Sequence, residues 1–300
     1  MKITEKYVLN LILSIILVFS LAGSGAAFFA KQYLLDADTF IAVSDEKNIP
    51  QKAYDEINEY FTQSAAYSGI PADVYMSALT VDNVKMLIDL RIQHMFTYIY
   101  AVGSGELEEH DFNDTDGIDF EQLEQNITNY FDEFAKENNV EVNDEYTAQL
   151  EKTIDTAKNE IMSITDIYMI SLIDETGIIT KVRSVYNYID PIIYACAGLA
   201  LVCIILIAVF SRKNICSAFY WISVSVMCTA VLALIPTLYL KLSGITDKLI
   251  VRNECVYAAF TGLFSDIIRT LLLAEIIILA VGIILLVTGG LISKLSGKKA

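Results

Sequence analysis

Residues 7–30 read YVLNLILSIILVFSLAGSGAAFFA, a run of 24 residues without a charge. A helix of this length extends about 36 Å at about 1.5 Å per residue, so it can cross a hydrocarbon core about 30 Å thick. Three more apolar runs follow at 191–211, 214–240 and 270–293, and the only charge within them is Glu275. Because unpaired backbone groups cost several kcal/mol each in lipid, such runs must be helical. We therefore expect an all-α fold with a four-helix transmembrane bundle.

The composition of the 300-residue chain supports this expectation. Hydrophobic residues make up 54% of the sequence and the mean hydropathy is +0.47, whereas apolar residues make up roughly 45–50% of soluble globular domains. Runs of this length exclude an ordinary soluble enzyme, a secreted domain and a disordered chain.

The distribution of Lys and Arg around the four runs predicts their orientation. Basic residues gather at the amino terminus, in the short turn at 211–214 and after the last run, and these segments hold a single acid, Glu5. We expect a multi-pass plasma-membrane protein with cytoplasmic N- and C-termini. The expected segments are a cytoplasmic N-terminus with the first span at 1–30, an extracytoplasmic domain at 31–188, spans at 189–211 and 215–240, an outer loop at 241–266, a span at 267–293 and a cytoplasmic tail at 294–300.

The predicted extracytoplasmic domain is strongly acidic. Residues 31–188 contain 31 Asp and Glu and 10 Lys and Arg, a net charge of −21, whereas the rest of the chain has a net charge of +5. Nucleic acids and anionic lipid head groups need basic surfaces, so we expect neither as a ligand of this domain. A negative surface can attract cations or basic partners, and it can also simply keep a domain soluble.

The first run has a second interpretation. Lys2 and Lys6 precede it, and the small residues at 22–27 resemble the cleavage site of a signal peptide. The run is longer than the roughly 7–15 residues of a signal-peptide core, which favours a retained anchor. The same small residues, spaced four apart, would let another helix approach closely.

The extracytoplasmic domain is expected to be a small helical bundle inserted between the first and second spans. Gly69 and Pro71 break the chain there, Thr80 is a candidate N-cap, and Asp119 with Gln122 resembles a capping pair. Apolar residues recur at helical spacing in four segments: Ala53, Ile57, Tyr60 and Phe61; Val84, Leu87, Ile88, Met95 and Ile99; Phe120, Leu123, Ile127, Tyr130, Phe131 and Phe134; and Leu150, Ile154, Ala157, Ile161 and Ile164.

Two further helix starts are predicted near the membrane. Asp190 and Pro191 can supply an N-cap and a first-turn proline for the second span. In the outer loop, apolar residues recur at roughly helical spacing from Leu249 to Ile267, which indicates an amphipathic helix. Such a helix can lie on the outer leaflet, pack beneath the acidic domain or line a cavity, and packing is the simplest expectation.

The loop at 103–117 is the candidate cation site. It concentrates carboxylates of the kind that calcium binds: Glu106, Glu108, Glu109, Asp111, Asp114 and Asp116. Its spacing departs from an EF-hand, because a loop with Gly117 in the sixth position would begin at Phe112 and end at Leu123, where acids are required. A solvated acidic loop is therefore favoured over a cation site.

The sequence contains no recognisable catalytic motif. Of the five cysteines, four lie in predicted spans and none in 31–188, so we expect no disulfide in that domain. His94 has no second ligand at metal-binding spacing. The zinc-protease, P-loop, nucleophile-elbow and dinucleotide-binding motifs do not occur. We predict no catalytic residue and no cofactor.

Glu275 is the candidate functional acid within the spans. Placing a charge at the bilayer centre costs at least about 2.5–3.5 kcal/mol, so an ionisable group there is by default a functional-site hypothesis. Glu275 lies a turn or two from the expected outer end of the fourth span, where Arg269 or interfacial water could stabilise it. An interfacial or packing role is favoured over a proton or ion relay.

Three short segments carry a resemblance to a family. They are GIPADVY at 69–75, TVDNVK at 80–85, and IDF at 118–120 leading to NITNY at 126–130. In these segments the chain resembles uncharacterised multi-span envelope proteins of Gram-positive bacteria, a resemblance that implies no activity or site. The layout is also similar to permease subunits of the FtsX and MacB type, but residues 211–214 leave little room for the cytoplasmic helix with which such a permease meets its ATPase.

These features favour a non-enzymatic plasma-membrane protein, surrounded by membrane lipid. Its acidic helical domain would bind another envelope or membrane protein or sense envelope conditions. The alternative is a transport component, either a permease-like subunit or a small carrier that uses Glu275. A third hypothesis is an enzyme at the membrane surface, which would need carboxylates that converge on a cleft.

Overall fold

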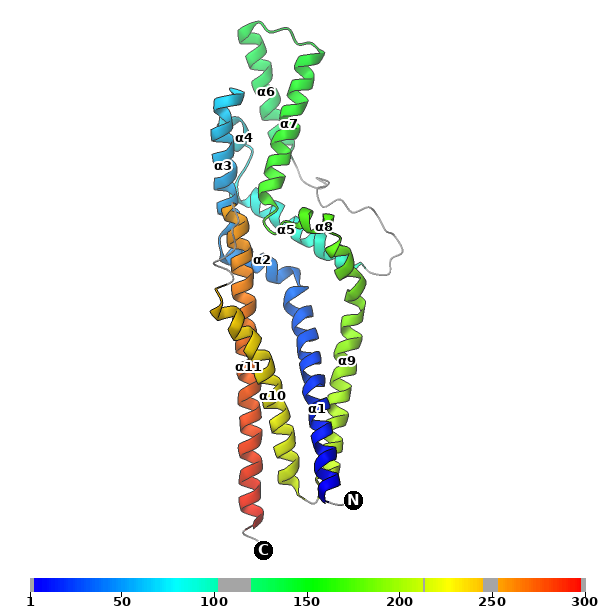
Figure 1. Cartoon of the computed structure of the whole chain (residues 1–300). Coiled ribbons are helices and arrows are strands. Elements are labelled where there is room, and N and C mark those ends of the chain that lie inside the picture. The colour runs from blue at the N-terminus through cyan, green and yellow to red at the C-terminus, as the bar shows by residue number, and fades with distance from the viewer. Residues whose placement is uncertain (1–2, 102–119, 213, 245–252, 298–300) are drawn as a thin grey trace. The chain divides into compact units, whose positions relative to one another are not determined.

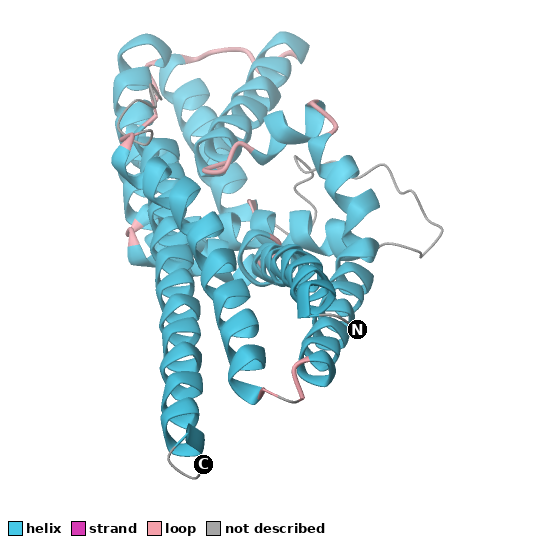
Figure 2. Ribbon diagram, turned by 60° about the horizontal axis from the view of Figure 1, so that its bottom comes forward, coloured by secondary structure: helices cyan, strands magenta, loops and turns pink. Residues whose placement is uncertain are grey.

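The computed structural model describes residues 3–101, 120–212, 214–244 and 253–297. Within these ranges every regular element is a helix (Figure 2), so the predicted all-α class is confirmed. The chain divides into two compact units. The spanning unit comprises Met1–Asp36, Val185–Leu249 and Phe264–Ala300, and the acidic unit comprises Ala37–Ser184 and Ile250–Leu263.

Four helices in the described ranges are long and apolar enough to cross a membrane, as predicted, which is the architecture of a multi-pass membrane protein. They are labelled in Figure 1 as α1 (Ile3–Phe29), α9 (Ile178–Phe210), α10 (Ile215–Leu242) and α11 (Glu254–Gly297). A short π-helical turn, η1 (Ala30–Leu34), extends α1. The helix α9 contributes its first residues to the acidic unit, and so does α11.

The predicted helix start at Asp190 and Pro191 is wrong, because α9 begins at Ile178 and contains both residues. A proline removes only one backbone hydrogen bond from a helix. The carboxylate of Asp190 does not act as a cap and instead accepts a hydrogen bond from Nζ of Lys31 at 2.7 Å. The helix therefore continues through the residues that were expected to begin it.

The fourth candidate span also differs from the expectation. The structure has one continuous helix, α11, where the sequence predicted a separate amphipathic helix before the span. The stretch from Glu254 to Gly297 contains no proline, and isolated glycines cost only about 1 kcal/mol each within a helix. Residues 254–266 of the expected outer loop are therefore the beginning of α11.

The core of the spanning unit lies between α1, α9 and α10. Gly23 allows α1 to approach α9, since an added Cβ would lie 3.3 Å from Sγ of Cys196. Trp221, the single tryptophan, packs its ring edge to face with Tyr7 at 5.1 Å. The buried members of this core are Leu13, Leu17, Ala200, Cys203, Ile207, Ala218 and Trp221.

A chain of buried polar side chains also links these three helices. We call it the polar ladder, and its members are Asn10, Ser14, Ser211, Ser225 and Thr229. Asn10 donates to Oγ of Ser211 at 3.2 Å, and the hydroxyls of Ser14 and Ser225 lie 2.6 Å apart. Because lipid offers no partner for a polar group, hydroxyls that face other helices bond across the interface. The ladder therefore joins α1 to α9 and α10.

The acidic unit contains seven complete helices within the described ranges. The glycine of the predicted break, Gly69, has φ 73° and ends the second of them, and Thr80 caps the fourth in a reciprocal capping box with Asn83. The predicted capping residue Asp119 lies outside the described ranges, and the helix after it begins at Glu121. The helices are α2 (Ala37–Glu46), α3 (Ile49–Ser68), α4 (Ala72–Met76), α5 (Val81–Tyr100), α6 (Glu121–Asn138), α7 (Asp144–Thr165) and α8 (Ile170–Glu175).

The first residues of α11 pack into the acidic unit. Cys255 and Ala259 are fully buried, and the ring of Phe260 lies 6.1 Å from the ring of Tyr168. Asn253, immediately before the helix, donates to Oε1 of Glu56 at 2.7 Å. Of the possibilities that the sequence left open for this segment, packing within the acidic unit is the one observed.

Candidate functional site

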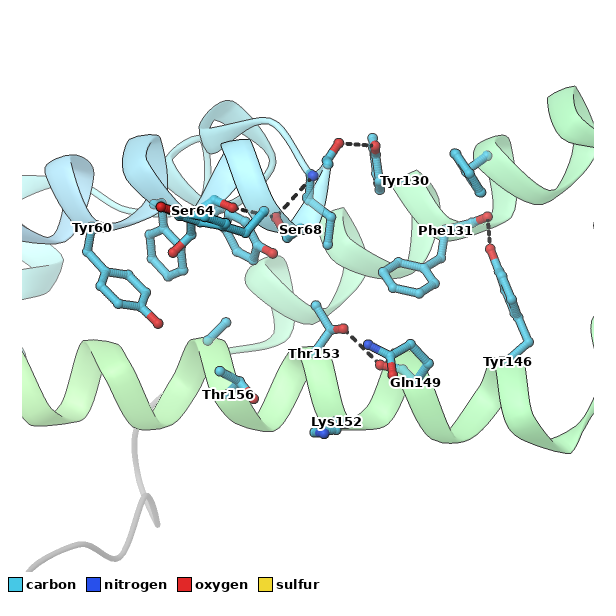
Figure 3. Close-up of a pocket in the computed structure, with 17 residues that line it drawn as sticks. Tyr60, Ser64, Ser68, Tyr130, Phe131, Tyr146, Gln149, Lys152, Thr153 and Thr156 are labelled. Carbon is cyan, nitrogen blue, oxygen red and sulfur yellow. Dashed lines mark hydrogen bonds between the residues drawn. The ribbon is translucent and has the colours of Figure 1, made fainter.

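An aromatic cleft opens between α3, α6 and α7 in the acidic unit (Figure 3). Its volume is about 760 Å³. Its walls are the C-terminal half of α3, the C-terminal half of α6 and the N-terminal half of α7. Eight aromatic side chains line it: Tyr60, Phe61, Tyr67, Tyr75, Tyr130, Phe131, Phe134 and Tyr146.

The cleft exists because the apolar core stops part of the way along these helices. On α6, Leu123 and Ile127 are buried, Tyr130 and Phe131 are half-buried, and Phe134 is 46% exposed. The same change occurs along α3, where Phe61 is buried and Tyr67 is 93% exposed. The aromatic rings beyond the core therefore face an open space between the helices.

Ring packing and two phenol hydrogen bonds fix the walls of the cleft. Phe61 and Tyr75 stack at 4.1 Å with nearly parallel rings. The hydroxyl of Tyr130 donates to the backbone oxygen of Gly69 at 2.8 Å, and that of Tyr146 donates to the backbone oxygen of Phe131 at 2.5 Å (Figure 3). Because these bonds join helix to turn and helix to helix, the rings are held in place before any ligand binds.

The polar lining is neutral apart from one lysine. Ser64, Gln149 and Thr153 supply hydroxyl and amide groups, and Lys152 is the only charged residue among those that line the cleft. Burial raises the pKa of Tyr75 to about 12, and burial beside Glu160 raises the pKa of Tyr60. The phenols of Tyr60 and Tyr75 therefore stay neutral at physiological pH.

This lining is suited to binding. No carboxylate, histidine or cysteine lies among the residues that line the cleft. What it offers is a large area of rigid aromatic surface with a few hydrogen-bonding groups, which is the usual character of a recognition pocket.

A buried ion pair lies elsewhere in the acidic unit. Arg91 is 5% exposed, its Nη1 donates to the backbone oxygen of Met162 at 2.6 Å, and the same atom lies 3.9 Å from Oδ2 of Asp166. The carboxylate of Asp166 also accepts from the backbone N–H groups of Ile170 and Ser171, at the start of α8. Both charges are compensated, so we assign this ion pair a structural role.

The structure describes only some of the site residues that were predicted from the sequence. The acidic loop with Glu108, Glu109, Asp111, Asp114 and Asp116 lies outside the described residues, and among the residues that are described no cluster of His, Cys, Asp and Glu could hold a metal ion. His94 is half-buried on α5.

The candidate acid Glu275 lies on α11 and is 4% exposed. Its Oε1 lies 2.7 Å from the hydroxyl of Thr237 on α10, whereas its Oε2 is buried without a hydrogen-bond partner. Its partner is thus a hydroxyl of the neighbouring helix. None of the ion pairs in the described ranges joins it to Arg269, the basic residue that could have stabilised it.

The aromatic cleft was not predicted from the sequence. The helical spacing of Tyr130, Phe131 and Phe134 indicated an apolar face of a helix. The available signal was composition, since tyrosine replaces aliphatic residues in the distal parts of α3 and α6, and tyrosine is the residue that suits a surface with one apolar and one wet side.

Comparisons with family models, with curated proteins and with solved structures returned no match for this chain.

Proposed function

We propose that this chain is a non-enzymatic plasma-membrane protein, with both termini in the cytoplasm and the acidic unit outside, that binds another envelope or membrane protein through the aromatic cleft. Four helices of membrane-spanning length support the membrane setting. Lys6, Arg212 and Lys294 lie at the ends of spans that share the side of the amino terminus, which supports this orientation.

The observation that carries the proposal is the exposure of large rings at a preformed cleft. Tyr67 and Phe134 are 93% and 46% exposed, although both line a space of about 760 Å³. Exposed apolar patches of this kind mark interaction sites, and aromatic residues in pockets supply much of the binding energy at protein interfaces.

The occupant that fits is an amphipathic helix with a basic polar face. The lining segment of α7 runs from Tyr146 to Ala157, about 16 Å at about 1.5 Å per residue. That length matches about three turns of a partner helix, with apolar anchors at positions i, i+3, i+4 and i+7.

The negative charge around the cleft favours a partner helix whose polar face is basic. Exposed carboxylates crowd the two helices of its outer wall: Asp132, Glu133 and Glu137 on α6, and Asp144, Glu145 and Glu151 on α7. Lys136 and Lys152 are the bases on the same segments. A partner with Lys or Arg flanking its apolar stripe would complement this surface, which increases the association rate and the specificity.

The test is the binding of a synthetic helix to the full-length protein in nanodiscs of zwitterionic lipid. The probe carries Leu and Phe on one face and Lys on the other, and empty nanodiscs give the lipid background. We expect saturable binding by fluorescence anisotropy, with the affinity reduced at least about tenfold in Tyr67→Ala and Phe134→Ala, a loss of about 1.4 kcal/mol or more. Val142→Ala, exposed on the same unit but outside the cleft, is the matched control.

The remaining outcomes separate other occupants. Equal binding of a probe with Glu in place of Lys would contradict the basic partner, and unchanged affinity in both cleft variants would overturn the site. Dimerisation of the wild type that Phe134→Ala abolishes would identify a second copy of the chain as the occupant.

The orientation has its own test. A cysteine introduced at Tyr67, which is almost fully exposed, should react with a membrane-impermeant thiol reagent in intact cells. Lys294→Cys should react only after the cells are made permeable. The opposite pattern would place the acidic unit in the cytoplasm.

A transport component is the second candidate, because Glu275 is a buried acid between two candidate spans. In a small carrier, Glu275→Gln would abolish transport while expression stays normal. In a permease-like subunit, an ATPase would co-purify with the chain under mild crosslinking. Neither outcome is expected of a protein that only binds a partner.

A further inference from the structure

The helices α10 and α11 approach closely at two glycines. A Cβ added to Gly282 would lie 2.5 Å from Cγ of Met227 and 3.2 Å from its backbone nitrogen. A Cβ added to Gly289 would lie 2.6 Å from Cβ of Phe219. Glu275, Gly282 and Gly289 are spaced seven apart, so they share one face of α11. Because α10 and α11 approach closely along this face, the carboxyl of Glu275 lies next to α10.

The hydroxyl of Thr237 is the one hydrogen-bond partner of that carboxyl among the described residues. The hydroxyl of Thr237 lies 2.7 Å from Oε1 of Glu275 and 3.0 Å from the backbone oxygen of Ala233. A hydroxyl has one proton, so it cannot donate fully to both oxygens. If Glu275 is protonated at Oε1, it donates to Thr237, and Thr237 donates to Ala233, so each of these two contacts has its own proton.

An ionised Glu275 would also lack a counter-charge. None of the ion pairs in the described ranges includes it, and its second oxygen is buried without a partner. The nearest charged residues along the two helices are Asp266 and Arg269 on α11 and Lys241 on α10, and Tyr239 is the nearest titratable neutral group on α10. A buried carboxylate without a partner is far costlier than the neutral acid.

We propose that Glu275 is a proton-binding site of the spanning unit, a neutral carboxylic acid that donates to Thr237 while α10 and α11 are packed together. Loss of the proton leaves a negative charge in this interface, which holds no cation to compensate it. Proton release is therefore coupled to separation of the two helices at this level. The site depends on the α10–α11 contact and not on the occupant of the aromatic cleft.

Infrared spectroscopy of the full-length protein in lipid nanodiscs tests this assignment. At neutral pH the wild type should show the carbonyl stretch of a protonated carboxylic acid, and isotope labelling of the glutamate carboxyls should shift it. The band should be lost in Glu275→Gln and move to higher frequency in Thr237→Val, which removes the hydrogen-bond partner. Glu254→Gln, at an exposed glutamate on the same helix, should leave it unchanged.

Two results overturn the proposal. The first is a wild-type spectrum without a protonated-carboxyl band at neutral pH, which decides the question even if a variant fails to fold. The second is a band that persists at full intensity in Glu275→Gln, since the proton would then reside on another acid.

Discussion

In the spanning unit, hydroxyl and amide side chains lie between the helices and bond one another, and the outward faces are apolar. In the acidic unit the outward faces carry charges, and the interior is apolar apart from a few compensated groups such as Arg91. Each arrangement suits one solvent, lipid in the first case and water in the second. The two sites that we single out lie where this pattern is interrupted, at exposed rings in the acidic unit and at a buried acid in the spanning unit.

The largest effect on stability is expected where the acidic unit buries a charge. Arg91→Met removes the partner of Asp166 and leaves the backbone oxygen of Met162 without its donor. Breaking a buried pair in this way costs about 3–5 kcal/mol of the unfolding free energy. Denaturant unfolding of the full-length protein in detergent, followed by circular dichroism, measures it. Lys47→Met, which removes a surface pair with Glu46, should cost less than about 1 kcal/mol.

A smaller loss is expected where two spans meet at a glycine. In Gly282→Leu the new side chain must displace Met227. Overpacking of this kind lowers the unfolding free energy by about 1–3 kcal/mol. Gly290→Leu is the matched control, because no atom lies within 4 Å of a Cβ added there. Equal melting temperatures for the two variants would show that α10 and α11 are not in close contact.

The polar ladder should respond more weakly still. Ser225→Ala removes one hydroxyl of the pair with Ser14, and hydrogen bonds between membrane helices average about 0.6 kcal/mol. Thr288→Ala, an exposed residue whose hydroxyl bonds only within its own helix, should change the stability less than Ser225→Ala does. A loss above about 2 kcal/mol for Ser225→Ala would mean that the ladder acts as one unit.

The smallest change in stability is expected at the exposed rings of the cleft. Tyr67→Ser removes a side chain that contributes little to the core, so the unfolding free energy should stay within about 0.5 kcal/mol of the wild type. Thermal unfolding followed by circular dichroism checks this value. A large loss would show that Tyr67 stabilises the fold, and the cleft would then lose its main support as a binding site.

Two features that depend on local sequence were predicted correctly. Four helices of spanning length follow from the uncharged runs, and the cap at Thr80 follows from a hydroxyl side chain immediately before the helical pattern that begins at Val81. The start at Asp190 and Pro191 was wrong because the helix already begins at Ile178 and continues through both residues.

Features that depend on distant contacts were beyond the sequence. Ser14 and Ser225 are separated by 211 positions, and nothing in either neighbourhood indicates that they bond. Similarly, helical spacing predicts that Phe134 belongs to an apolar face, but only the packing of α3 against α7 determines whether a core reaches that far. Glu275 was recognised as unusual, whereas Thr237 as its partner required the structure.

Trp221 gives the two units different optical signatures. It is the only indole in the chain, it lies in the core between α1, α9 and α10, and its neighbours are the phenol rings of Tyr7 and Tyr220. Selective excitation of this fluorophore therefore reports on the membrane-spanning helices alone. Its emission should shift to the red when that bundle opens and stay constant when a ligand quenches tyrosines of the acidic unit, so one native residue can assign a conformational event to its half of the molecule.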